Sequence, residues 1–313
     1  MYRYNIIYIV LIVCLASNVV FSQQTCRAIA FSGAADRGAY EAGVVMGLVE
    51  NADPQDVQWQ VVTGVSAGSI NAAAVTMFNV GNEVGAKDFI VNQWLNITKE
   101  KIYKNWDGGI VEILQKSVFD TSPLHQYLDS CVNQTLVANS DRTMLIGATN
   151  IDTGLFQAFD QKDPEIVLAI MASSAMPGLF PKIQKDGYSY CDGGIVFMTP
   201  VSSAIELCMA KGATDVIVDV MIINDPNTFI NETNQHTLAL LAREGQIIVK
   251  NIFMKDIMSA RAAYPNAQIN IHSPSEQLPG DFIGFQYSKV MIEMGYKDAV
   301  AGLNSRKKVS NKL

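Results

Sequence analysis

Apolar and polar positions in the first part of the chain alternate between strand-like and helix-like periods. An apolar stretch over 26–31 predicts a short buried strand, and apolar residues at three- and four-residue steps predict a helix over 39–50. A second apolar strand, starting near Gln58, leads into Gly64-Val65-Ser66-Ala67-Gly68, and an Ala-rich helix follows it. This order of strands and helices is typical of an α/β protein with parallel strands.

The rest of the chain continues this alternation. The expected elements are strands over 143–150 and 155–159 joined by a turn at 152–154, a helix over 165–171, a strand over 188–191, a helix over 201–211, a strand over 216–223, a helix over 237–258, a strand over 268–272 and a helix over 288–301. Between 79 and 141 the pattern is mixed, and it indicates only helical pieces near 89–95 and 124–128. Because no linker or repeat interrupts the pattern, we expect a single domain over 23–313.

The first 22 residues have a different pattern from the rest. Arg3 is followed by an apolar run that ends near Phe21, and small residues precede Gln23. This order of charge, apolar run and small residues predicts a signal peptide over 1–22. An uncleaved membrane anchor is the alternative, although the run is interrupted by Asn5 and Asn18 and is short of the ~20 residues that a span requires.

A signal peptide predicts entry into the secretory pathway, so that the protein would be secreted or lumenal. Three N-x-Ser/Thr triplets agree with this route, at Asn96, Asn133 and Asn231. The cysteines that follow the leader are Cys26, Cys131, Cys191 and Cys208. In an oxidising compartment they permit up to two disulfides, and the pairing stays open.

Charge and cysteine spacing exclude some classes of function. Without residues 1–22 the chain would lose only Arg3 among its charged residues, leaving a net charge of −8. This balance argues against a nucleic-acid partner and against strong electrostatic attraction to anionic membranes. No pair of cysteines has the CxxC spacing of a metal site, so we expect no metal and no other cofactor.

The Gly64–Gly68 segment carries the first candidate catalytic residue. A serine on a sharp turn between strand and helix has its hydroxyl exposed beside the positive end of the helix, so Ser66 is a candidate nucleophile. Gly64 and Gly68 would allow the strand and helix backbones to approach closely.

A serine nucleophile needs a base. The order Ser66, Asp192 and either His236 or His272 would form a triad, but nothing in the sequence around either histidine marks it as catalytic. Asp192 follows a predicted strand and precedes two glycines, so a ligand could approach it closely. It could act as the base without histidine if it were buried within hydrogen-bond reach of the serine hydroxyl.

A candidate oxyanion hole lies between the first strand and the first helix. Its residues are Gly33, Ala34, Ala35, Arg37 and Gly38. Backbone N–H groups gathered at the start of a helix stabilise negative charge. The loop is not a dinucleotide loop, because Ala35 stands where the second glycine of G-x-G-x-x-G is required.

These segments together resemble the patatin-like phospholipases. The similar segments are 31–40, 64–68, 172–181 and 192–194, in the order and spacing of that family, with a further likeness at 294–299. The resemblance covers about residues 26–300. It implies a three-layer α/β/α fold with a mostly parallel sheet. It also implies a Ser-Asp dyad of Ser66 and Asp192, with the Gly33 loop as the oxyanion hole and Arg37 beside it.

The implied activity is hydrolysis of acyl esters in phospholipids and related lipids, of the phospholipase A or lysophospholipase type, at a membrane or micelle surface and without a metal. The chain departs from the family pattern at two points. Gly33-Ala34-Ala35 replaces three glycines, and Met198-Thr199 precedes Pro200 where the family commonly has asparagine. Two alternatives therefore remain: an esterase with a Ser-Asp-His triad, and a catalytically weakened lipid-binding or storage glycoprotein. The sequence does not locate the substrate-binding residues.

Overall fold

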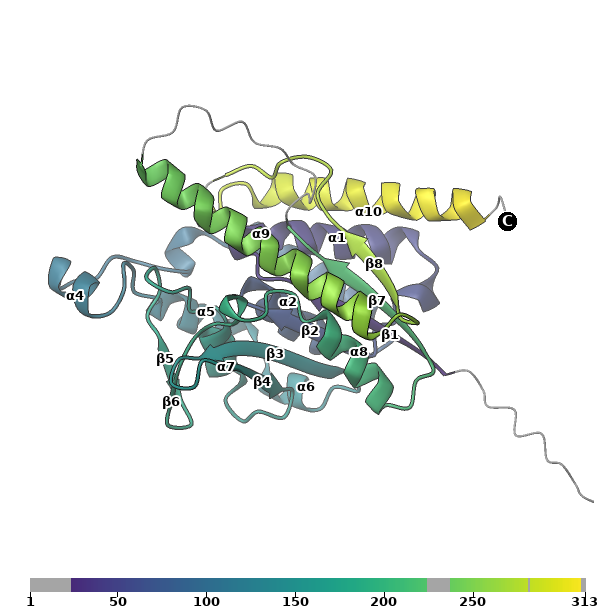
Figure 1. Ribbon diagram of the computed structural model, residues 1–313, viewed down its shortest axis with the longest axis horizontal. Coiled ribbons are helices and arrows are strands. Elements are labelled where there is room, and N and C mark those ends of the chain that lie inside the picture. The colour runs from purple at the N-terminus through teal and green to yellow at the C-terminus, as the bar shows by residue number, and fades with distance from the viewer. Residues whose placement is uncertain (1–23, 224–236, 281, 311–313) are drawn as a thin grey trace, which may run out of the picture.

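A computed structural model describes residues 24–223, 237–280 and 282–310, and it has an α/β fold around one mixed sheet (Figure 1). The strands are β1 (Thr25–Phe31), β2 (Val61–Val65), β3 (Thr143–Asn150), β4 (Phe156–Asp160), β5 (Ile183–Lys185), β6 (Tyr188–Asp192), β7 (Asp215–Met221) and β8 (Gln268–His272). The predicted signal peptide, Asn231 and His236 lie outside the described residues. No helix in the described part of the chain is both long enough and apolar enough to cross a membrane.

The sheet has eight strands in the order β5-β6-β3-β2-β1-β7-β8, and β4 pairs separately with β3. The pairs between β3, β2, β1, β7 and β8 are parallel, as the strand–helix alternation predicted. The β4, β5 and β6 pairs are antiparallel. The predicted hairpin between β3 and β4 is present, with Gly147 opposite Ala158.

Helices cover both faces of the sheet, which confirms the three-layer class. They are α1 (Gly38–Asn51), α2 (Ala67–Thr76), α3 (Glu83–Asn96), α4 (Ile110–Gln115), α5 (Ser122–Cys131), α6 (Gln134–Ala138), α7 (Ile166–Ser173), α8 (Val201–Ala210), α9 (Thr237–Ala263) and α10 (Ser288–Ser310). On one side α1 packs against α10 and α3. On the other side α8 packs against β1 and β7, and α9 lies outside it, crossing in front of the sheet in Figure 1.

The structure corrects the bounds of several predicted elements. The helix predicted over 237–258 continues to Ala263, and the helix predicted over 288–301 continues to Ser310. Both extensions contain few large apolar residues, so an apolar period gives no signal there. The stretch over 79–141 contains four helices, α3 to α6, and two of these are only five or six residues long.

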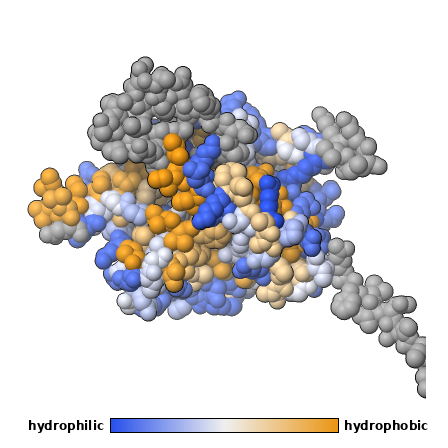
Figure 2. Space-filling view, viewed as in Figure 1, coloured by the Kyte–Doolittle hydropathy of each residue, from blue (hydrophilic) through white to orange (hydrophobic). Residues whose placement is uncertain are grey.

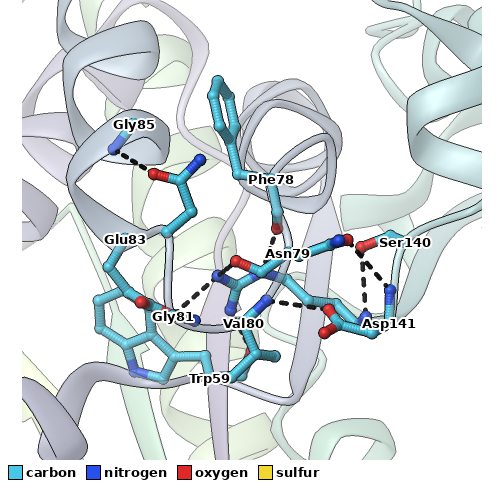
Figure 3. Close-up of polar contacts among 11 residues, drawn as sticks. Trp59, Phe78, Asn79, Val80, Gly81, Glu83, Gly85, Ser140 and Asp141 are labelled. Carbon is cyan, nitrogen blue, oxygen red and sulfur yellow. Dashed lines mark hydrogen bonds and ion pairs between the residues drawn. The ribbon is translucent and has the colours of Figure 1, made fainter.

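A fully buried arginine fixes the connection between α2 and α3 (Figure 3). The Arg142 guanidinium donates to the carbonyl oxygens of Trp59, Phe78 and Asn79. It also pairs with Glu83 at 2.8 Å. Carbonyls left without partners after the end of α2 are thereby satisfied. Since Arg142 immediately precedes β3, this contact ties the start of β3 to the helix that follows Ser66.

The described residues contain one disulfide, between Cys26 of β1 and Cys208 of α8. It closes a loop of 182 residues and joins the central strand to the helix covering it. Cys131 and Cys191 are free thiols, so only one of the two bridges that four cysteines permit is formed.

Candidate active site

Ser66 lies on the turn between β2 and α2 in a strained conformation, with φ 55° and ψ −130°. A non-glycine residue at positive φ costs about 1–3 kcal/mol and must be held by its surroundings. The Ser173 hydroxyl provides such a contact, accepting from the Ser66 N–H at 2.9 Å and donating to the Gly147 carbonyl at 2.6 Å. The Ser69 N–H and hydroxyl both donate to the Ser66 carbonyl oxygen. The strained turn is therefore bonded on both sides of Ser66.

The glycines on both sides of Ser66, Gly64 and Gly68, are required for steric reasons. A Cβ added at Gly68 would lie 2.4 Å from the Ser32 carbonyl oxygen, and one added at Gly64 would lie 2.1 Å from the Gly68 oxygen. Real Cβ atoms do not approach backbone this closely. The close approach of loop, strand and helix at Ser66 therefore requires glycine at both positions.

Asp192 is buried at the end of β6, and the Gly194 N–H donates to its carboxylate at 2.8 Å. Burial raises the pKa of Asp192 to about 6, and the Ser66 side chain and the Gly194 N–H oppose the rise. The carboxylate is thus a stronger base than an exposed aspartate, and the Ser66 side chain is near enough to act on its pKa.

Strand register explains how two residues 126 positions apart meet. Val65 pairs with Gly147 across the parallel β2–β3 ladder, so Ser66 follows at the end of that pair. Asp192 pairs with Ala148 across the antiparallel β3–β6 ladder. Both side chains therefore lie beside the same part of β3, and Gly147 contacts the two segments from between them.

Some backbone N–H groups of the candidate oxyanion loop donate hydrogen bonds within the protein, and others do not. The N–H of Gly33 donates to the Met198 carbonyl at 3.0 Å, and that of Arg37 donates to the Ala34 carbonyl at 3.1 Å. The Gly38 N–H donates to the carbonyls of Ala35 and Asp36. Among the described residues, the N–H groups of Ala34 and Ala35 have no acceptor. These two amides are the ones available to an oxyanion.

Ala35 has φ 50°, so the sequence departs from glycine at a position where glycine is favoured. Ala34 has φ −138°, which alanine adopts without this cost. Ala35 lines the same cavity as Ser66, and a Cβ added at Gly33 would lie 3.4 Å from the Ser66 Cβ. The loop therefore lies directly beside the serine side chain.

Met198 covers the candidate site from the side of α8 and α9. Its sulfur would lie 2.2 Å from a Cβ at Gly33 and 2.5 Å from one at Gly194, so both glycines make room for it. The Asp256 carboxylate on α9 accepts from the N–H groups of Met198 and Thr199 at 2.8 and 2.9 Å. Burial raises the pKa of Asp256 to about 6, and these hydrogen bonds oppose the rise.

A third buried carboxyl group lies beside the candidate oxyanion loop. Glu41 of α1 accepts from the Ser32 N–H and hydroxyl at 2.9 and 3.1 Å, and from the Asn71 amide at 2.8 Å. Asn71 in turn accepts from the Trp94 indole at 2.7 Å. Burial raises the pKa of Glu41 to about 8. This network joins α1, α2 and α3 to the residue that precedes Gly33.

An apolar pocket opens at Ser66, with a volume of about 430 Å³ that includes the open space at its mouth. Its lining residues are mostly aliphatic or aromatic: Ala35, Ala67, Ile70, Trp94, Ile97, Ile102, Leu124, Met176, Phe180, Ile283 and Phe285, with Ser66 and Ser174 as polar members. A neighbouring cavity of about 340 Å³ shares Ile70, Trp94 and Ile97 with it. A hydroxyl at one end of an apolar cavity suits a long, uncharged group such as an acyl chain.

Arg37 and the two described histidines make contacts with residues other than Ser66 and Asp192. The Arg37 guanidinium stacks over the Phe282 ring at 4.6 Å, and burial lowers its pKa. His272 ends β8, three strands from β2 or about 14 Å across the sheet, and its Nε2 lies 2.9 Å from Asp219. His125 is half exposed and faces Asp129. Neither described histidine reaches Ser66.

A comparison with protein families identifies the family to which this arrangement of residues belongs. A family model described as patatin-like phospholipase matches residues 29–205, more than half of the 313-residue chain. The chain belongs to the patatin-like phospholipase family. The matched part of the family domain contains Ser66, Asp192 and the Gly33 loop, whereas α9 with Asp256 and the whole of α10 follow it.

Solved structures of other proteins have a distant likeness to this chain. VipD from Legionella pneumophila aligns over 90% of this chain and 67% of its own, with 10% identity and a TM-score of 0.41. The type III effector protein ExoU aligns over 90% and 53%, with 12% identity and a TM-score of 0.39. ExoU in its complex with SpcU from Pseudomonas aeruginosa aligns over 90% of this chain and 52% of its own, with 14% identity and a TM-score of 0.36. The chain spans about half the length of the ExoU chains that it matches.

Sequence reasoning did not find several residues that shape the site. Ser173 lies in the 172–181 segment that carried the family resemblance. The sequence therefore marked this segment, but it did not predict that Ser173 would contact Ser66. Asp256 and Glu41 are single carboxylates on helices and had no signal. Among the described residues, no group of three or more histidine, cysteine or acidic side chains is arranged to hold a metal ion.

Proposed function

We propose that this chain is a lipid acyl hydrolase in which Ser66 attacks the ester carbonyl and Asp192 is the general base. The single observation that carries the proposal is the placement of Ser66, on a strained turn that opens into an apolar pocket, beside the buried Asp192 carboxylate. Phospholipids and lysophospholipids carry acyl esters of the kind that this cavity suits, so phospholipase A or lysophospholipase activity is the specific proposal.

The reaction follows from the positions of these groups. Asp192 takes the proton as the Ser66 oxygen bonds to the carbonyl carbon, and the carbonyl oxygen becomes negative. The free N–H groups of Ala34 and Ala35 and the N-terminus of α2 stabilise that charge. The alcohol leaves with the proton from Asp192. Asp192 then takes a proton from a water molecule as the water oxygen attacks the acyl carbon, and it returns this proton to the Ser66 oxygen as the fatty acid leaves.

The test is hydrolysis of a panel of phospholipids, lysophospholipids and neutral esters by the purified chain. Ser66→Ala and Asp192→Asn should each lower kcat by about 10⁴-fold or more. Ser174→Ala is a matched control, because Ser174 lines the same cavity and its hydroxyl has no hydrogen-bond partner among the described residues. A fluorophosphonate should label the chain and the Ser174→Ala variant but not Ser66→Ala. Equal activity in Ser66→Ala would refute the proposed mechanism.

The second candidate is a lipid-binding glycoprotein with little turnover, and Ala35 is the observation that favours it. A strained alanine in place of glycine puts a methyl group into the cavity beside one of the two free amides. A misplaced oxyanion donor costs about 10²–10³-fold in rate. Binding of a fluorescent fatty acid without fluorophosphonate labelling of Ser66 would support this candidate over the hydrolase.

We also propose that the protein enters the secretory pathway with residues 1–22 removed and sugars at its N-x-Ser/Thr sites. The Cys26–Cys208 disulfide supports an oxidising compartment. Asn96 and Asn133 are exposed, as glycan acceptors must be. Expression in a secreting eukaryotic cell should yield a chain that starts near Gln23 and shifts in mass after glycosidase treatment. An intact leader and an unshifted mass would refute this route.

A further inference from the structure

The most exposed apolar residues of the described chain lie on a projection that we define as residues 104–120, the α4 projection. Ile110 is 72% exposed and Leu114 81%, and Val111 and Ile113 are exposed beside them. Figure 1 shows α4 standing away from the body at the left, and Figure 2 shows hydrophobic colouring over the same part of the molecule. Burial of such residues is favourable in proportion to their apolar area, so their exposure calls for a partner.

The base of the α4 projection is joined to the rim of the Ser66 cavity. The N–H groups of Val118 and Phe119 donate to the carbonyls of Gly178 and Leu179, both at 2.9 Å. The next residue, Phe180, lines the cavity. On the other side Ile102, which also lines the cavity, leads into the projection two residues before Lys104. A surface that covers α4 would therefore lie beside the cavity.

A tryptophan and polar side chains flank the exposed apolar residues of the α4 projection. Lys116 Nζ lies 4.4 Å from the centre of the Trp106 ring and 2.9 Å from Glu112. The Trp106 indole donates to the Ser117 carbonyl at 3.0 Å. Tryptophan and lysine are the residues that lie at the head-group level of membranes, with apolar residues below them in the acyl region.

The shape of the α4 projection favours a lipid surface over a protein partner. The helix has six residues, and its apolar side chains point outward from a convex tip. A stable protein interface needs about 1,200 Å² or more of buried surface, which a tip of this size does not supply alone. A lipid surface accepts a short amphipathic segment to a depth of about 5–10 Å without a complementary groove.

We propose that the α4 projection inserts into the surface of a lipid bilayer or micelle and holds the mouth of the Ser66 cavity against it. This inference rests on the proposed lipid hydrolase function for its purpose, but the insertion is measurable without catalysis. The overall negative charge of the chain makes apolar insertion, rather than charge attraction, the main source of affinity.

The test uses the Ser66→Ala chain and sedimenting vesicles of phosphatidylcholine. Leu114→Asp and Ile110→Asp should each weaken binding by about tenfold or more, because they put charge into the inserted tip. Met258→Asp is the matched control, since Met258 is an equally large side chain, 63% exposed, on α9. It should change binding by less than about twofold. Wild-type vesicle binding by both α4 variants would overturn the proposal.

Tryptophan fluorescence gives an independent measurement of depth. Trp59 and Trp94 are buried, whereas Trp106 is partly exposed at the base of the projection. Phosphatidylcholine with brominated acyl chains should therefore quench mainly Trp106, and Trp106→Phe should abolish most of the quenching. Quenching that persists in Trp106→Phe would overturn insertion by this segment.

Activity measurements separate failure of this inference from failure of the proposed function. Leu114→Asp, with Ser66 intact, should hydrolyse a soluble short-chain ester at the unmodified rate and vesicle lipid at least about tenfold more slowly. Loss of vesicle activity with unchanged vesicle binding would refute docking while keeping the hydrolase. No hydrolysis of either substrate by the unmodified chain would refute the hydrolase, and vesicle binding would still decide the inference. A change in oligomeric state with Leu114→Asp, without a change in vesicle binding, would assign α4 to a second copy instead.

Discussion

The main-chain N–H of Gly33 donates a hydrogen bond to the carbonyl oxygen of Met198, over 3.0 Å. The same stretch is held from α9, because the Asp256 carboxylate accepts from the N–H groups of Met198 and Thr199. The position of the oxyanion loop therefore depends on a helix that follows the matched family domain. Asp256 does not touch the cavity, so we assign it a positioning role.

Asp256→Ala should lower kcat for ester hydrolysis by about 10–100-fold with little change in KM, because the unpaired 198–199 backbone would shift the Gly33 loop. Asp256→Asn keeps one carbonyl oxygen as an acceptor and should recover most of the lost rate. The measurement is steady-state kinetics on a soluble ester, with circular dichroism to check folding. Equal kcat in Asp256→Ala and the unmodified chain would contradict the positioning role.

The rate of hydrolysis should fall at acid pH with a midpoint near the pKa of Asp192, which burial raises to about 6. In the proposed mechanism the carboxylate is the base, so the active form is present above this pKa and is lost as the pH falls through it. Below the midpoint kcat/KM should drop about tenfold per pH unit. Asp256 has a similarly raised pKa, so the profile should be repeated with Asp256→Asn. Disappearance of the acid limb in that variant would assign it to Asp256.

Ala35→Gly should raise the free energy of unfolding by up to about 1 kcal/mol, because glycine adopts φ 50° without strain. The matched control is Ala34→Gly at φ −138°, where no strain is relieved and the added freedom of the unfolded chain should destabilise by about 0.4–1 kcal/mol. Denaturant unfolding of the two variants measures the difference. Equal destabilisation by both would show that Ala35 is not strained.

Ile70→Ala should shift the preferred acyl chain to a greater length, because Ile70 lines both apolar cavities and its removal would join them. Leu124→Ala, which lines only the cavity at Ser66, should broaden that cavity without this extension. The measurement is kcat/KM for a series of esters that differ only in acyl length. The same length profile in both variants would argue against the second cavity as an extension of the first.

Arg142→Ala should destabilise the fold by about 3–5 kcal/mol, because it leaves Glu83 buried without its partner. The double variant Arg142→Met with Glu83→Gln should lose less, since no charge then remains in the interior. Thermal and denaturant unfolding of the two variants give the comparison. A larger loss in the double variant would mean that the carbonyl contacts of Arg142, rather than its charge, dominate.

The parallel core was predictable because buried strands and the Ser66 turn have short, local signals. The β3–β4 hairpin followed in the same way from its turn residues. The α3–α6 stretch was predictable only in part: the helical pieces expected near 89–95 and 124–128 lie within α3 and α5, whereas α4 and α6 are too short to show an apolar period. The α4 projection shows this limit most clearly, since its apolar residues face outward, where an apolar pattern normally indicates burial.

The site residues also divide into those that the sequence marked and those that it did not. Ser66, Asp192 and the Gly33 loop lie at strand ends next to small residues, where sequence gives a signal. The Gly33 amide donates to a backbone partner far along the chain, Met198, whereas the Arg37 and Gly38 amides donate to carbonyls within the loop. No local pattern records such a contact. For the same reason the sequence left open which amides would face an oxyanion.

The two members of the proposed dyad belong to parts of the sheet with unequal support. Ser66 follows β2, which has a parallel neighbour on each side, whereas Asp192 ends β6, which pairs with β3 over only three residues before the edge strand β5. Local opening begins where few contacts must break. A modest rise in temperature could therefore detach the β5–β6 hairpin and its carboxylate while the central strands stay folded. Activity would then be lost at a lower temperature than that at which the core melts. Cooling before the core melts would restore the activity.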